Sequence, residues 1–166
     1  MNDSLLQPNM SLTEVNAISA LGLAHMGDCV FELLVRTSLC ADGKSTARNL
    51  HKETVKRVSA PAQAERMDRM LPLLSEEELD FFKRGRNAQV HGVPKNASRG
   101  DYSRATGLES LFGALWLLGR QERVLELFLA TEEESHALCR ALPDGHDRRT
   151  AGRGRHADRP GPAAHP

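Results

Sequence analysis

The stretch Leu21-Gly-Leu-Ala-His-Met-Gly-Asp-Cys-Val-Phe-Glu32 is an apolar run with a glycine and an aspartate, Gly27 and Asp28, near its centre. Its apolar side chains recur at spacings of three and four, which predicts a helix. Burying an aspartate in such a helix is costly unless the carboxylate is paired, hydrogen-bonded or bound to a cation. Because glycine has no side chain, another backbone or a ligand can approach closely beside it. The sequence therefore raises the question of what Asp28 faces.

A second stretch, Tyr102-Ser-Arg-Ala-Thr-Gly-Leu-Glu-Ser-Leu-Phe-Gly-Ala-Leu-Trp-Leu-Leu-Gly119, repeats this pattern. Glu109 lies beside an apolar helical stripe, and Gly113 lies one turn further along on the same side. If the two helices pack together, Asp28 and Glu109 come side by side, where their charges repel and a divalent cation such as Mg²⁺ relieves the repulsion. In the alternative interpretation, each acid is a partly exposed residue, a helix cap or the partner of a basic group.

The composition bounds the class of protein. The chain has 166 residues, of which 40% are apolar and 4% aromatic, which suits one helical domain with a core, assigned to residues 11–142. From Pro143 onward arginine and proline dominate, so we expect residues 143–166 to form a disordered basic tail. The formal net charge is zero, so any surface for nucleic acid must be locally basic.

The cysteines and the apolar runs indicate the compartment. Cys29, Cys40 and Cys139 follow no metal-ligand spacing, which favours a reduced cytosolic setting. No run reaches the ~18 uninterrupted apolar residues of a membrane-spanning helix, and the N-terminus lacks the pattern of a secretory signal. We therefore expect a cytoplasmic protein with no membrane partner.

Local signals in the first part of the chain predict where helices begin and end. Ser11-Leu-Thr-Glu14 has the form of a capping box and should start the first helix. The apolar pattern continues to about Cys40 with a break near Gly22, and Gly43 suits the left-handed position that ends a helix. Ser45 is the expected cap of the next helix.

Similar signals follow in the second part. Pro61 fits the first turn of a further helix, and Ser75-Glu-Glu-Glu78 is a capping box that opens a helix to about Arg84. An amphipathic helix that includes Val124 closes the domain and should run to about Leu142. No segment shows the alternation of a strand, so we expect an all-α bundle.

Several segments resemble the ribonuclease III domain, and in particular its short branch, Mini-ribonuclease III. Gly27-Asp28 within residues 23–32 is similar to the signature helix of that family, and Leu108-Glu-Ser-Leu-Phe-Gly-Ala-Leu-Trp-Leu117 is similar to its second acidic helix. The segments that match the short branch are Leu50-His-Lys, Val58-Ser-Ala-Pro-Ala-Gln-Ala-Glu65, Lys83-Arg-Gly-Arg-Asn-Ala88 and Pro94-Lys-Asn96. The resemblance covers residues 14 to 130, and that branch lacks a separate double-stranded-RNA-binding domain.

The sequence departs from the larger ribonuclease III enzymes at three acidic positions. Their signature helix carries further acids where this chain has Leu21 and Ala24, and their second acidic helix carries an aspartate where this chain has Thr106. Asp28 and Glu109 are the two family acids that remain, so the number of bound metal ions stays open.

The resemblance implies an activity and its cofactor. It implies a dimeric, magnesium-dependent endoribonuclease that cleaves double-stranded RNA and leaves 5′-phosphate ends, with Asp28 and Glu109 as catalytic residues and Mg²⁺ ligands. For the short branch the implied substrate is precursor 23S ribosomal RNA, and a ribosomal protein or subunit is a further candidate partner. The alternatives are a noncatalytic RNA-binding or ribosome-assembly module that keeps the fold, and a helical protein-interaction domain.

Basic and amide side chains between the two acidic helices suit contacts to RNA phosphates. By composition alone, this segment is better explained as a solvated linker, and the resemblance reverses that preference. The helix before Pro61 adds further basic residues, which could extend the same RNA-binding surface. In the alternative interpretation, they form an ordinary solvated helix face. The side chains expected to bind RNA are Lys52, Lys56, Arg57, Arg84, Arg86, Asn87, Lys95, Asn96 and Arg99.

Overall fold

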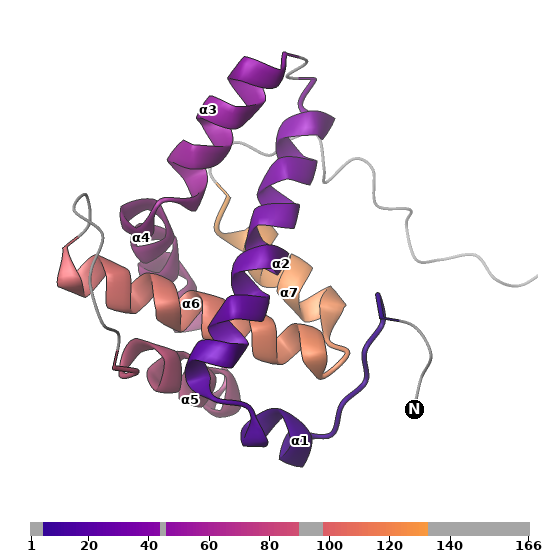
Figure 1. Cartoon of the computed structure of the whole chain (residues 1–166), viewed down its shortest axis with the longest axis vertical. Coiled ribbons are helices and arrows are strands. Elements are labelled where there is room, and N and C mark those ends of the chain that lie inside the picture. The colour runs from indigo at the N-terminus through magenta and orange to yellow at the C-terminus, as the bar shows by residue number, and fades with distance from the viewer. Residues whose placement is uncertain (1–4, 44–45, 90–97, 133–166) are drawn as a thin grey trace, which may run out of the picture.

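The computed structural model describes residues 5–43, 46–89 and 98–132, and every regular element in these residues is a helix (Figure 1). The expected all-α class is therefore confirmed. No helix in the described residues combines the length and apolar character needed to cross a bilayer. The elements are α1 (Leu12–Ala17), α2 (Ala20–Ala41), α3 (Ala47–Val58), α4 (Ala60–Met70), the 3-10 turn η1 (Leu71–Leu73), α5 (Glu76–Arg86), α6 (Arg99–Leu117) and α7 (Gln121–Ala130).

The two acidic helices form the centre of the bundle. α2 packs across α6, and α6 also contacts α4, α5 and α7 (Figure 1). Phe31 of α2 lies between Phe112 of α6 and Phe128 of α7, with edge-to-face ring pairs at centroid distances of 5.9 Å each. All three rings are fully buried. Such aromatic pairs add to the free energy of apolar burial, so they fix how α2, α6 and α7 pack.

Three of the predicted helix ends are confirmed. Ser11 caps α1, and its backbone N–H donates to Glu14 Oε2 at 2.8 Å. Ser75 and Glu78 form the same reciprocal box at the start of α5. Gly43 follows the C-cap of α2 with φ of 77°, a left-handed conformation that glycine adopts without steric cost.

Two predicted helix starts were wrong. The break in the first apolar segment lies at Ile18 and Ser19, not near Gly22, because the Ser19 hydroxyl accepts the Gly22 N–H at 3.0 Å and caps α2. Thr46 caps α3 in place of Ser45, and its hydroxyl serves the same purpose one residue later. Ser45 itself lies outside the described residues. The second error is small because serine and threonine both cap helices.

Two helix ends also differ from the expectation. α5 continues to Arg86 rather than Arg84, and α7 ends at Ala130 rather than near Leu142. In the last turn of α7, the Phe128 carbonyl accepts a hydrogen bond at 2.7 Å from a side chain of α4, which satisfies a carbonyl that a longer helix would use internally. Residues 133–166 lie outside the described part of the chain, so the C-terminal tail and the domain end stay predictions.

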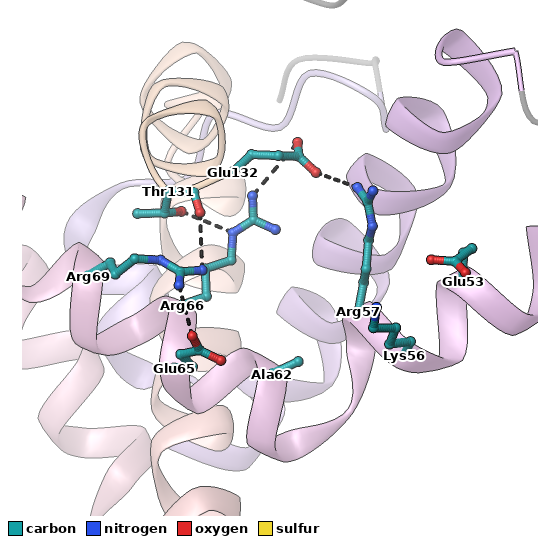
Figure 2. Close-up of a pocket in the computed structure, with 9 residues that line it drawn as sticks. All are labelled: Glu53, Lys56, Arg57, Ala62, Glu65, Arg66, Arg69, Thr131 and Glu132. Carbon is teal, nitrogen blue, oxygen red and sulfur yellow. Dashed lines mark hydrogen bonds and ion pairs between the residues drawn. The ribbon is translucent and has the colours of Figure 1, made fainter. Parts of the chain in front are cut away.

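Arg66 of α4 joins the end of α7 to the rest of the bundle. Its side chain is buried, its Nε donates to Thr131 Oγ1 at 3.0 Å, and its guanidinium lies 4.0 Å from the centroid of the Phe128 ring. Glu132 accepts a hydrogen bond from Arg57 of α3 at 2.7 Å and lies 3.8 Å from Arg66 (Figure 2). A cavity of about 240 Å³ lies beside this network, between α3, α4 and the residues that follow α7. The network therefore connects three helices through buried charges.

Candidate active site

Two glycines bring the backbones of α2 and α6 into contact. An added Cβ at Gly27 would lie 1.7 Å from the backbone oxygen of Glu109, and one at Gly113 would lie 2.0 Å from the backbone oxygen of Leu23. Neither position can carry a side chain unless the helices separate, because real Cβ contacts under 3.0 Å essentially do not occur. The crossing point therefore lies next to Asp28 on one helix and at Glu109 on the other.

The two carboxylates at this crossing influence each other. Burial raises the pKa of Glu109 to about 7, with the negative charge of Asp28 as the second cause. The pKa of Asp28 is also raised, first by partial burial and then by the charge of Glu32, against a smaller lowering by His25. Asp28 is exposed at the surface and Glu109 is half-buried. The structure thus brings together two acids that lie 81 residues apart in sequence, as the packing argument predicts.

Both carboxylates suit Mg²⁺ by their chemistry. A hard cation prefers carboxylate oxygens, and Mg²⁺ keeps several waters, so one or two protein carboxylates are enough to bind it. Burial, and after it the charge of Asp28, disfavour the ionised form of Glu109 and raise its pKa, and a bound cation would favour that ionised form. Among the described residues, no group of three or more His, Cys, Asp or Glu side chains could hold a metal ion. At this crossing, Asp28 and Glu109 are the carboxylates that could provide oxygen ligands.

The sequence analysis missed one residue that the structure places here. Gln63 of α4 is 1% exposed, and its side chain lies near enough to Glu109 to lower the pKa of that carboxyl against the larger effect of burial. The available signal was a glutamine on the buried, mostly apolar face of its helix. That signal identifies a polar residue that needs a partner, but does not tell which partner it has.

The positions of the three missing acids show what replaces them. Leu21 is exposed, Ala24 is buried, and the Thr106 hydroxyl donates to the Tyr102 carbonyl at 3.0 Å within α6. None of these side chains supplies a charged oxygen. Of the family's usual acidic positions, those of Asp28 and Glu109 are therefore the two that carry an acid at the helix crossing.

Comparison with known proteins decides the family. Residues 21–120 match the model of the ribonuclease III domain. The chain is 46% identical to the Mini-ribonuclease 3 of Thermoanaerobacter sp. (strain X514), over 72% of this chain and 87% of that protein. It is 38% identical to the Mini-ribonuclease 3 of Symbiobacterium thermophilum, over 75% and 95% of the two chains.

The chain belongs to the Mini-ribonuclease III family. It is accordingly an endoribonuclease, a hydrolase of the ribonuclease III type. Its fold is similar to a crystal structure of a Fusobacterium nucleatum protein, with a TM-score of 0.65 and 28% identity over 70% of this chain and 93% of that one. The ribonuclease III family acts on double-stranded RNA.

The basic side chains of α3 differ in their surroundings. Lys52 and Lys56 are exposed and one turn apart. Arg57 is paired with Glu132, whose side chain is 4% exposed. If Arg57 turned toward RNA, the buried Glu132 carboxylate would lose this partner, which is costly. Arg57 therefore has a structural role in the fold.

The basic residues between the acidic helices divide in a similar way. Arg84 donates to the side-chain oxygen of Asn16 at 2.8 Å and to the Ile18 carbonyl at 3.0 Å, so it ties α5 to the residues around α1. Arg86 is exposed and donates to the side chain of Asn87, the C-cap of α5, at 3.2 Å. Arg99 is exposed in the first turn of α6. Lys95 and Asn96 lie outside the described residues.

Proposed function

We propose that this endoribonuclease is magnesium-dependent and that Asp28 and Glu109 are its Mg²⁺ ligands and catalytic residues. The observation that carries the proposal is the glycine-mediated crossing of α2 and α6, which couples the charges of the two carboxylates. Two like charges held close together in a partly buried site destabilise the protein unless a proton or a cation neutralises them. Divalent metal dependence is general in the ribonuclease III family, which agrees with this role.

In such a site the residues of this chain have defined tasks. Asp28 and Glu109 provide oxygen ligands, and the contact at Gly27 and Gly113 sets the separation of the two helices that carry them. A bound Mg²⁺ supplies Lewis-acid polarisation of the phosphate and lowers the pKa of its water. No protein general base is required for hydrolysis to 5′-phosphate and 3′-hydroxyl products.

The proposed substrate is a double-stranded stem of precursor 23S ribosomal RNA, which places the enzyme in the cytoplasm with the ribosomal subunit or a ribosomal protein as a further partner. Exposed donors that recognise phosphate suffice for A-form RNA, since it is read mainly through its backbone and 2′-hydroxyls. The exposed residues Lys52, Lys56, Arg86 and Arg99 supply such donors.

We also propose that two copies act together as a homodimer. Leu21 and Leu33 of α2 are 43% and 55% exposed, although other apolar residues of this helix, such as Leu23, are buried in the core. Large exposed apolar side chains on one helix favour a contact with a second copy, and a two-fold axis would give one site for each RNA strand. Sedimentation velocity tests this, because Leu33→Glu should shift the protein toward monomer.

The test of the site is cleavage by matched variants. Asp28→Asn and Glu109→Gln should abolish magnesium-dependent cleavage of a long RNA duplex, while circular dichroism and the oligomeric state stay unchanged. Glu122→Gln, which removes an exposed carboxylate in the first turn of α7, is the control and should cleave normally. Full activity of either site variant would refute the assignment.

The metal requirement can be tested directly on the unmodified protein. Incubating it with duplex RNA, with and without Mg²⁺, should give shorter products only with the metal. A noncatalytic RNA-binding module would instead retain the RNA without cutting it, an outcome that the family assignment disfavours.

A further inference from the structure

Gln63 is a buried amide on a helix face that is otherwise mostly apolar. It is 1% exposed, and its neighbours on that face, Ala64 and Met67, are buried as well. Its Nε2 is enclosed, and within the described residues it meets no acceptor in full hydrogen-bond geometry. Leaving such a donor unpaired is destabilising, so an acceptor close to Gln63 would stabilise the fold by pairing with it.

The acceptor that Gln63 approaches is the Glu109 carboxylate. α4 packs against α6, and the Gln63 side chain lies near enough to Glu109 to favour its charged form, whereas burial and the charge of Asp28 disfavour that form. A glutamine amide has two N–H donors, and a carboxylate accepts in several directions. A hydrogen bond between the two groups would satisfy the enclosed donor and the half-buried acid together.

Other buried polar groups nearby do not offer the same pairing. Ser110 is adjacent to Glu109 in sequence and its hydroxyl is also buried without a partner among the described residues. Its Cβ, however, lies 2.5 Å from the position that a Cβ at Gly85 would take, so it faces the contact between α5 and α6. The Thr106 hydroxyl already donates to a carbonyl within α6.

We propose that Gln63 is a positioning residue whose side-chain amide donates to the Glu109 carboxylate and fixes the direction in which it points toward Asp28. This inference rests on the proposed function of the two acids as metal ligands. Residues that hydrogen-bond a metal ligand orient it and reduce the freedom that the ligand loses when the metal binds. Gln63 therefore sets how well the paired carboxylates are arranged for a cation before it arrives.

A double-mutant cycle on stability tests the contact itself, without metal and without RNA. Gln63→Met keeps the length of the side chain and removes its donors. At pH 8 it should lower the melting temperature of the otherwise unmodified protein by about 5 °C, because a hydrogen bond to a charged group is lost. In a Glu109→Gln background, the same change should lower it by less than half as much.

Equal losses in the two backgrounds would overturn the proposal, since Gln63 would then contribute packing alone. Gln63→Leu provides a second apolar variant if Gln63→Met does not fold. Met67→Leu, a volume-conserving change in the core one turn along α4, is the matched control and should give the same small shift in both backgrounds.

A magnesium titration of duplex cleavage then tests the consequence. Gln63→Met should raise the Mg²⁺ concentration for half-maximal rate by about 10-fold, whereas Met67→Leu leaves it unchanged. An unchanged magnesium requirement in Gln63→Met would overturn the positioning role. If the stability cycle shows coupling but the unmodified protein cleaves no duplex at any Mg²⁺ concentration, the proposed function fails while the contact between Gln63 and Glu109 stands.

Discussion

Replacing Gly27 with alanine tests whether backbone contact between α2 and α6 determines both the fold and the site. The new Cβ would lie 1.7 Å from the backbone carbonyl oxygen of Glu109 and 2.5 Å from the carbon of the same carbonyl. Ordinary van der Waals contacts begin at 3.4 Å. The two helices would have to separate by roughly 1.7 Å, because the obstructing atoms are backbone and cannot rotate away. The same movement would draw Asp28 away from Glu109.

The expected cost is large for one methyl group. Overpacking a core typically costs about 1–3 kcal/mol, and a clash with rigid backbone at the crossing of the two central helices should exceed that, at about 4 kcal/mol. Against a total stability of about 5–15 kcal/mol, this should lower the melting temperature by more than ~10 °C. Thermal unfolding followed by circular dichroism measures the shift, and the remaining folded protein should cleave duplex RNA poorly.

The control is Gly100→Ala in the first turn of α6. There the nearest atom to an added Cβ is the Ser98 hydroxyl oxygen at 3.7 Å, and the position is exposed. Alanine should stabilise this helix by about 0.5 kcal/mol, because it restricts the unfolded chain more than glycine does. If Gly27→Ala proved as stable as the unmodified protein, the close approach of the helices would be refuted.

Four further predictions concern charge. Because burial and the neighbouring carboxylate raise the pKa of Glu109 from 4.5 to about 7, the folded state holds a proton that the unfolded state releases between these values. Without divalent cations, the free energy of unfolding should therefore fall as pH rises from about 4.5 through 7, by at most about 3 kcal/mol in urea titrations, and Glu109→Gln should abolish the fall. Adding Mg²⁺ at pH 8 should raise the melting temperature of the unmodified protein and leave that of Glu109→Gln unchanged. Arg66→Met should cost about 3 kcal/mol by urea unfolding because it leaves a buried carboxylate short of a partner, whereas Arg36→Met, at an exposed pair within α2, should change stability by less than about 0.5 kcal/mol. Replacing Lys52 and Lys56 together with glutamine should weaken RNA binding and flatten its dependence on salt, as measured by filter binding at several ionic strengths.

The features that depend on neighbours within one helical turn follow from the amino-acid sequence. The capping boxes at Ser11 and Ser75 and the left-handed Gly43 are set by hydrogen bonds and backbone angles that a few residues decide. Helical periodicity likewise specified an all-α chain. The pairing of Asp28 with Glu109 was also within reach, because each acid lies by a glycine that permits close packing.

Tertiary packing alone decided which partner each buried polar group meets. From the sequence, Gln63 is a glutamine on a mostly apolar helix face. The packing of α4 on α6 then places it close to Glu109. Arg57 and Arg84 have the composition of an RNA-binding surface, yet one is paired with Glu132 and the other bonds the residues around α1. A charged side chain has the same sequence signature whether it meets solvent, RNA or a buried partner, because that choice depends on segments tens of residues away.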